Sequence, residues 1–191
     1  MNFKTKLIAL IVIAIFSITL LTPVTTLAQE YKHHAAVLTH LENDEYLYPY
    51  DVEFDSQDNA YVVVEGYNYD IGEYEQYIVK LNPESQVLWA KRISEDYAYI
   101  YFIAYDEYSN KLFIAGEYYF NGGWHGFIAK LNANNGDFEK ALLTLWTNSI
   151  HHWPSTIVPD GKGNIYVGDW VDYYSDRWFT GAYILKFDVE F

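Results

Sequence analysis

Short apolar segments separated by polar turns recur three times along the chain. In each repeat an apolar strand leads into an Asp-x-x-x-Asn turn and a second apolar strand follows, over residues 52–66, 103–116 and 157–168. A block with an apolar-Lys-apolar centre then comes at 77–82, 127–132 and 183–188. The turn aspartates Asp55, Asp106 and Asp160 are spaced by 51 and 54 residues. Two matched blocks at one period of roughly 50 residues are typical of propeller blades.

Each repeat is expected to form four antiparallel strands, in units of about 46–93, 97–146 and 150–191. Asp and Asn bind their own backbone in tight turns, so the Asp-x-x-x-Asn segments join the first two strands of each unit. Unit three has no fourth strand before Phe191, whereas the segment 35–41 precedes unit one and resembles one. The sequence therefore predicts an all-β, β-propeller-like array of about three four-stranded blades over residues 29–191, with the last blade completed by the N-terminal strand 35–41.

Three blades are too few for a closed ring, because propellers use roughly four to eight blades around a channel. Two interpretations remain open. A homodimer would form a six-blade ring in which the strand 35–41 of each copy completes the last blade of its partner, as a strand exchange with twofold symmetry. Alternatively, the chain is a fragment of a longer propeller of about six to eight blades.

Residues 1–28 resemble a secretory signal peptide. Lys4 and Lys6 form a basic start, 7–21 is an almost unbroken apolar run, and Ala28 is a small residue at a suitable cleavage position. The apolar run of 15 residues is shorter than the ~20 that a membrane-spanning helix needs, so cleavage is favoured over a retained anchor. We therefore expect a secreted or cell-surface protein that meets the membrane only through this segment.

The composition narrows the classes of partner and of chemistry. The formal net charge is −14, and such an acidic surface repels phosphate backbones, so no nucleic-acid partner is expected. The chain has no cysteine, which excludes disulfides, thiolate metal sites and a cysteine nucleophile. With 20 Tyr, 6 Trp and 11 Phe the chain is strongly aromatic, and aromatic enrichment favours strands.

Aromatic residues concentrate between the second and third strands of each repeat, in three segments expected to be long loops on one face: 67–74, 118–125 and 170–178. Tyr and Trp rings stack on the apolar face of sugars, and neighbouring carboxylates bind hydroxyl groups. The candidate ligand-binding residues are Tyr69, Tyr74, Tyr119, Trp124, His125, Trp170, Tyr174 and Trp178. An extracellular glycan or another surface partner is the expected ligand. The alternative is that these rings pack between blades.

No segment carries an established catalytic or cofactor motif. The pairs His33-His34 and His151-His152 lack a third ligand at a recognisable spacing, and adjacent strand residues point to opposite faces. The sequence therefore predicts no catalytic residues, no cofactor and no metal. A structural subunit of a surface assembly is the alternative to the binding function. A glycoside hydrolase or lyase is a third, with an acidic pair made of Asp70 or Glu73 and Asp172 or Asp176.

The repeated residues resemble the SBBP family of bacterial and archaeal β-propeller repeats. In unit one the matching positions are Asp55, Asn59, Tyr61, Val62, Lys80, Leu81 and Trp89. With their counterparts in the other units, these positions extend over about 140 residues. The family usually has Gly before the Asn; only Gly163 keeps it, and Asp58 and Ser109 stand there in the other units. The resemblance implies a secreted β-propeller, with no single established activity and no catalytic residues.

Overall fold

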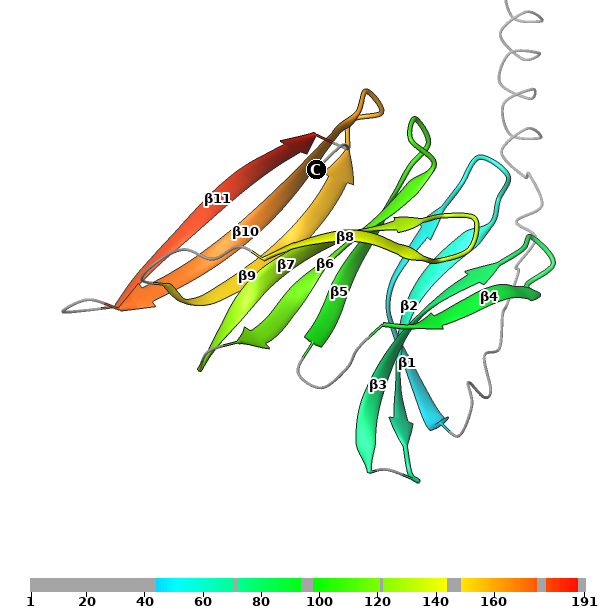
Figure 1. The fold of residues 1–191 in the computed structure, drawn as a ribbon, viewed down its shortest axis with the longest axis horizontal. Helices are drawn as coiled ribbons and strands as arrows, with labels where there is room; N and C mark the ends of the chain where they lie inside the picture. Colours follow the sequence, from blue (N-terminus) through cyan, green and yellow to red (C-terminus); the bar gives the residue numbers. More distant parts are fainter. Residues whose placement is uncertain are drawn as a thin grey trace, which may run out of the picture. The chain divides into compact units, whose positions relative to one another are not determined.

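The computed structural model describes residues 44–70, 72–93, 98–120, 122–143, 149–174 and 178–188. Side chains are described for 47–70, 72–93, 98–120, 122–142, 151–172 and 180–188. All of these residues belong to one compact unit of the chain, Ala36–Phe191. They form eleven β-strands (Figure 1). Among them there is no helix of the length and hydropathy needed to cross a membrane.

The strands build three antiparallel sheets, one for each repeat of the sequence. The first sheet has the order β1-β2-β3-β4, with strands Asp44–Phe54, Ala60–Asn68, Glu73–Leu81 and Val87–Arg92. The second has the order β5-β6-β7-β8, with strands Ala98–Asp106, Lys111–Phe120, Gly123–Asn132 and Phe138–Leu143. The third has the order β11-β10-β9, from Trp178–Asp188, Asn164–Tyr174 and Ser149–Pro159. The prediction of an all-β fold built from three repeated strand sets is confirmed. The expected extra strand, 35–41, lies outside the described residues.

The first and third Asp-x-x-x-Asn turns form as their sequence predicts. The Asp55 carboxylate accepts hydrogen bonds from the backbone N–H groups of Gln57 and Asn59 and from the Asn59 side chain. Asp160 accepts the same set from Lys162 and Asn164. These bonds close the turn because one carboxylate satisfies several backbone donors.

The second of these turns is one residue longer than the other two. The Asp55 N–H donates to the carbonyl oxygen of Asn59 across the first turn, with three residues between them, whereas Asp106 pairs with Lys111 across the second, with four residues between them. The left-handed backbone position moves accordingly, from Asp58 with φ +61° to Asn110 with φ +53°. Asn tolerates this conformation, so the turn does not need the Gly that the repeat pattern usually places there.

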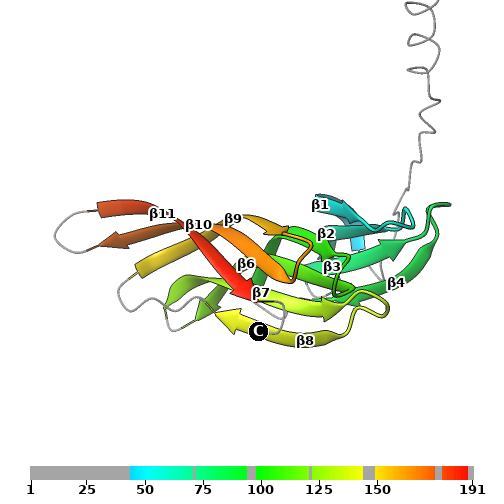
Figure 2. The same cartoon turned by 90° about the horizontal axis from the view of Figure 1, so that it is seen from above.

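Two apolar layers join the three sheets, whose order is visible in Figure 2. In one layer, the first sheet contributes Tyr61, Val63 and Ile78. These side chains pack on one face of the second sheet, which carries Leu112, Ile114 and Leu131. The other layer joins the opposite face of the second sheet, with Phe113, Ala115 and Ile128, to Ile157, Ile165 and Val167 of the third. The second sheet is therefore covered on both faces.

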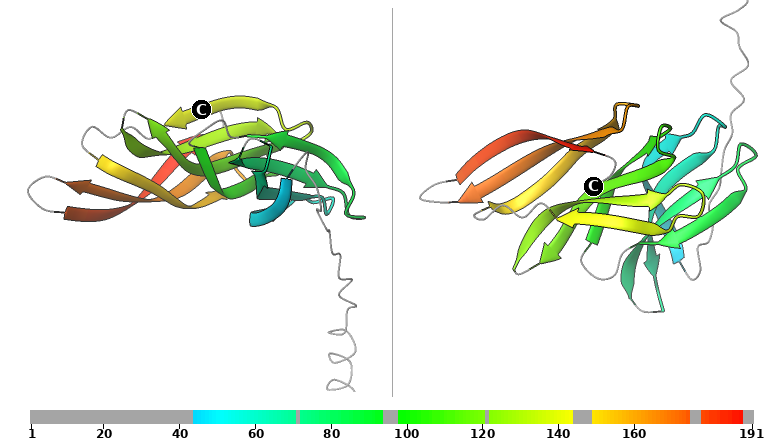
Figure 3. Two further views of the ribbon diagram at one scale, coloured as in Figure 1. Left: turned by 90° about the horizontal axis from the view of Figure 1, so that it is seen from below. Right: turned by 45° about the horizontal axis from the view of Figure 1, so that its top comes forward.

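The aromatic segments between the second and third strands of each repeat are not long loops, so that expectation was wrong. β2 and β3 stay paired out to Asn68 and Glu73, and β6 and β7 out to Phe120 and Gly123. The aromatic residues extend the strands because they fit a pleated, half-buried surface. Gly72 and Gly122, with φ +74° and +86°, supply the positive φ values that a tight hairpin turn needs. These hairpin turns lie at the end of the sheets opposite to the Asp-x-x-x-Asn turns (Figures 1 and 3).

Candidate functional site

The places where β2 meets β3, β6 meets β7 and β10 meets β11 are here called the hairpin ends, and aromatic rings cluster at the first two of them. At the first hairpin end, Tyr67 lies edge-on against Tyr69 and Tyr74, with ring centroids 4.8 Å and 4.9 Å apart. Tyr69 and Tyr74 are exposed, and so are the neighbouring Asp70 and Glu73. This end therefore presents ring surface and carboxylates together.

The second hairpin end has a similar aromatic cluster. Trp124 packs against Tyr99 and Tyr119, with ring centroids 5.4 Å and 5.3 Å apart. Tyr119 is exposed and Trp124 is half-buried. His125 Nε2 lies 3.1 Å from the carbonyl oxygen of Phe120, which ties this imidazole to its own hairpin.

In the third sheet the predicted residues are arranged differently. Trp170 lies on the sheet face rather than at the hairpin end, and its ring centroid is 5.2 Å from that of Trp153 on the neighbouring strand. The Trp153 ring in turn stacks on His151. The side chains of Tyr174 and Trp178 lie outside those that the structure describes. The described ring contacts thus group the candidate binding residues by sheet, with one cluster in each sheet.

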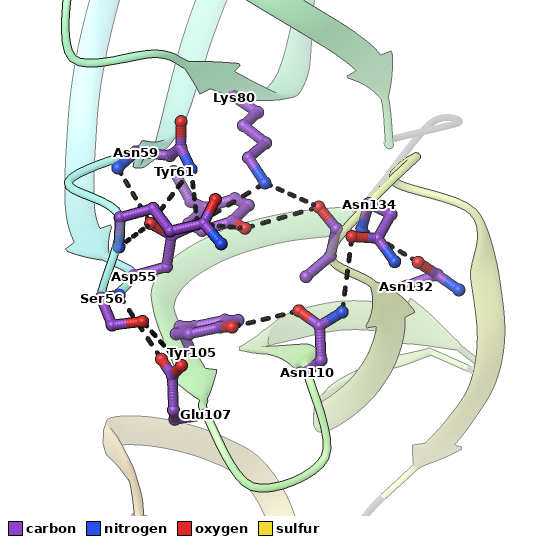
Figure 4. A network of polar contacts seen from close by, with 12 residues as sticks. Asp55, Ser56, Asn59, Tyr61, Lys80, Tyr105, Glu107, Asn110, Asn132 and Asn134 are labelled. Carbon is purple, nitrogen blue, oxygen red and sulfur yellow. Dashed lines mark hydrogen bonds and ion pairs between the residues drawn. The ribbon is translucent and has the colours of Figure 1, made fainter.

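A second group of polar residues, which the sequence indicated only as repeat markers, links the first sheet to the second (Figure 4). The Tyr61 hydroxyl donates to Asp55 Oδ2 at 3.1 Å, and it lies 3.5 Å from the carbonyl oxygen of Ala133 in the turn between β7 and β8. Lys80 Nζ donates to the same carbonyl at 3.4 Å and lies 3.6 Å from Asp55 Oδ2. The ring of Tyr105 stacks on Tyr61 with centroids 5.5 Å apart. We call Asp55, Tyr61 and Lys80 the clamp of the first sheet.

The electrostatics of the clamp follow from its burial and from its hydrogen bonds. Burial alone would raise the pKa of Asp55, but hydrogen bonds from Asn59, Gln57 and Tyr61 lower it overall. Burial and the charge of Asp55 raise the pKa of Tyr61, so its hydroxyl stays protonated and acts as a donor. The clamp therefore holds a turn of the neighbouring sheet through a carboxylate that accepts and a hydroxyl that donates.

Buried carboxylates form a third feature, and sequence reasoning missed it. The Tyr101 hydroxyl donates to Glu117 Oε2 at 3.2 Å, and His152 Nδ1 lies 3.0 Å from Asp169 Oδ2. Burial raises the pKa of Glu117 to about 7; the hydrogen bond from Tyr101 opposes this shift and the charge of Asp169 adds to it. Glu65 occupies the matching place in the first sheet, and burial raises its pKa as well. An acidic residue inside an apolar strand is the signal that could have revealed this set.

These acids do not make a metal site. No group of three or more His, Cys, Asp or Glu residues suited to a metal ion occurs in the part of the chain that the structure describes. Within that part, Glu117 Oε1 and Asp169 Oδ1 are buried without a hydrogen-bond partner. Unpaired buried carboxylate oxygens are costly, and they make the junction of the second and third sheets sensitive to ionisation.

Comparison with known proteins adds little to this geometry. No family model matches the chain, and no curated protein matches it either. Among solved structures, the chain is similar to an acylaminoacyl peptidase of Pyrococcus horikoshii with a TM-score of 0.31 and 12% sequence identity. The match covers 76% of this chain and 33% of the peptidase, so this chain spans about one third of the length of that protein. At this TM-score the similarity supports no conclusion on fold or function.

Proposed function

We propose that the chain is a secreted β-propeller protein that binds extracellular glycans through its hairpin ends. The observation that carries this proposal is the pair of aromatic clusters around Tyr74 and Trp124, each at the same end of its sheet and each partly open to solvent. The signal-like residues 1–28 support export, and the resemblance of the repeats to SBBP repeats supports the propeller.

The chemistry of these ends suits sugars better than other ligands. The apolar C–H face of a sugar ring packs on an exposed Tyr or Trp ring, and carboxylates such as Asp70 and Glu73 accept hydrogen bonds from its hydroxyl groups. Two clusters on neighbouring sheets would engage successive units of one polymer. A repeating polysaccharide is therefore a better ligand for this arrangement than a single small sugar, because linked weak sites gain affinity from each other.

A six-blade propeller ring formed by two copies of the chain is also part of the proposal. Two copies provide six sheets, and the segment 35–41 of each copy pairs with the outer edge of β11 in the other as its fourth strand. The supporting observation is that the equivalent strands β3 and β7 each pair with a further strand, β4 and β8. Deleting 35–41 should convert the dimer to a monomer or an aggregate in size-exclusion chromatography with light scattering. A dimer that survives the deletion would contradict the strand exchange.

Binding is tested with soluble polysaccharides by affinity electrophoresis and calorimetry. Trp124→Ala and Tyr74→Ala should each weaken binding by about tenfold, because one lost stacking contact costs about 1–2 kcal/mol. Tyr108→Ala is the matched control, since Tyr108 is 70% exposed but lies in the turn between β5 and β6 at the opposite end. Absence of binding, or equal binding by all variants, would overturn the glycan proposal. A subunit role in a surface assembly is then the second candidate, and the exposed apolar face of the third sheet favours it.

A further inference from the structure

The side of the first sheet that is turned away from the second sheet is buried along its two central strands. The side chains there alternate along β2 and β3 with Tyr61, Val63 and Ile78, which pack on the second sheet. We call this side the outward face. Four of its residues are 0–5% exposed and form one buried cluster: Val64, Tyr77, Val79 and Leu81.

A charged side chain is buried on the outward face as well. Glu75 is 2% exposed, and its carboxylate accepts a hydrogen bond from the Tyr77 hydroxyl at 2.7 Å. The Arg92 guanidinium lies 2.9 Å from the same carboxylate. Water reaches a carboxylate on an open sheet face, so this degree of burial requires protein atoms above it. The covered row runs along β3 from Glu75 to Leu81, which is about 20 Å.

No strand of the described chain provides this cover. The buried cluster, together with Ala60 and Val62 packed against it, consists of residues of β2 and β3 alone. The main neighbour of β1 and β2 outside their own sheet is β5, among the strands that the structure describes. β5 lies on the opposite side, where its Tyr105 stacks on Tyr61. The cover therefore comes from residues outside the described ranges.

The cover is also narrow. β1 and β4 flank the two central strands, and their side chains on the outward face are open to solvent. Val52 is 46% exposed beside the half-buried Val62, and Val87 is 50% exposed beside Leu81. A neighbouring sheet would extend over the edges, because its strands repeat every ~4.8 Å. A single extended segment lying along β2 and β3 fits this pattern of exposure.

One stretch of the chain has the length that this cover needs. Apart from the residues before Asp44, the stretches outside the described ranges have at most five consecutive residues, in 144–148. Five extended residues span about 17 Å, which is shorter than the covered row. The segment 35–41, Ala-Ala-Val-Leu-Thr-His-Leu, is largely apolar and spans about 23 Å when extended. It matches the row in length and in chemical character.

The start of β1 brings this segment to the covered row. Asp44 pairs with Asn68 at the hairpin end of the first sheet. The Asn68 side chain lies on the outward face, where its amide donates to Glu75 Oε2 at 3.2 Å. The three steps from Leu41 to Asp44 span about 10 Å, which is the spacing of packed β layers. A chain that reverses at this point runs along the outward face between Glu75 and Leu81.

We propose that the segment 35–41 lies along the outward face of its own first sheet, as a strap over Val64, Val79 and Leu81. Its regulatory role rests on the proposed function, in which the same segment pairs with β11 of a second copy. A segment that lies on its own first sheet cannot pair with that strand at the same time. The strap therefore holds a single copy in a closed state, and strand exchange requires its release.

Cross-linking of the full chain tests the strap, because the chain has no cysteine of its own. The pair Thr39→Cys with Ala90→Cys places one thiol in the strap and one on β4, where the exposed Ala90 pairs with Val79. In the monomer fraction from size exclusion, a short bismaleimide should link this pair within one chain. Thr39→Cys with Tyr108→Cys, in the turn between β5 and β6, is the matched control and should stay unlinked. Linking of the first pair only between chains, or no faster than the control, would overturn the strap.

A second pair reports the exchanged position of the segment separately. Thr39→Cys with Ile184→Cys places the second thiol on β11, where Ile184 is 81% exposed. This pair should link only between chains and only in the dimer fraction. Linking to position 90 without linking to position 184 keeps the strap and overturns the exchange. The reverse result overturns the strap and keeps the exchange.

The sheet side of the contact is tested by Val62→Asn in the chain with thiols at 39 and 90. Val62 is half-buried on the outward face, and its cross-strand neighbour Val52 is exposed on the same face, so Val52→Asn is the matched control. Val62→Asn should slow the intrachain reaction by about tenfold and raise the dimer fraction, because a buried amide without a partner weakens docking. Circular dichroism checks that both variants keep their strands. Equal effects of the two substitutions, or none, would contradict the strap.

Discussion

Replacing Glu117 by Gln should remove a large part of the pH dependence of folding stability. Glu117 is 5% exposed at the junction of the second and third sheets, and burial raises its pKa to about 7 from an ordinary value of 4.5. In the unfolded chain the carboxyl loses its proton near the ordinary value. Between pH 4.5 and 7 the folded chain therefore binds more protons than the unfolded chain, and the free energy of unfolding falls as the pH rises.

The size of the effect follows from the shift. Each pKa unit corresponds to about 1.4 kcal/mol, so the ionised Glu117 lowers the free energy of unfolding by about 3 kcal/mol above pH 7. Below pH 4.5 the carboxyl is protonated in both states and the penalty vanishes. Gln keeps the shape and an oxygen that accepts the hydrogen bond from Tyr101, but it never ionises. The variant should match the parent chain near pH 4.5 and exceed it by about 3 kcal/mol at pH 8.

The assay is urea unfolding followed by tryptophan fluorescence at half-unit steps from pH 4.5 to pH 8. Glu84→Gln is the matched control, because Glu84 is exposed in the turn between β3 and β4. Its stability curve should run parallel to that of the parent chain. If the free energy of unfolding of Glu117→Gln depends on pH in the same way as that of the parent chain, the burial of an ionisable carboxylate at this junction is refuted.

Two further predictions concern the packing of the sheets. Lys80→Met should lower the free energy of unfolding by about 1–3 kcal/mol in urea, because it removes the ammonium that binds a turn carbonyl of the second sheet; Lys162→Met, on an exposed lysine, should change it by less than about 0.5 kcal/mol. Gly116→Ala should lower the melting temperature or abolish folding, since a Cβ atom there would lie 1.9 Å from the backbone oxygen of Tyr99, whereas Gly122→Ala meets no atom within 4 Å and should cost only about 1–2 kcal/mol for its positive φ. Equal losses at the two positions of either pair would contradict these assignments.

The repeat and its turns could be predicted from the sequence because their determinants are local. Asp55 and Asn59 close their turn with hydrogen bonds that span four residues, so spacing alone predicts the structure. The second turn shows the limit of this reasoning. Asp106 and Asn110 have the same spacing, yet that turn is one residue longer, because Asn110 itself takes the left-handed conformation and Asp106 pairs with Lys111.

The hairpin ends show where local reasoning went wrong. Polar and glycine residues between aromatic ones predict long loops, but cross-strand pairing continues through Tyr67 and Tyr74 and through Tyr119 and Trp124. Pairing between aromatic residues of neighbouring strands is itself stabilising, so these segments prefer an extended hairpin to an open loop. The predicted residues therefore lie on the ends of strands, in rigid positions fixed by the sheet.

What the sequence could not reveal is which face of each sheet meets another sheet. Strand alternation divides residues between two faces, but it does not say which face is covered. The pair of Tyr61 and Lys80 becomes informative only once the turn of the second sheet is seen to lie against it. The same cross-strand pair recurs as Tyr166 and Lys186 on a face of the third sheet where Ile184 and Val158 are exposed, so an identical spacing accompanies a covered face in one sheet and an exposed face in another.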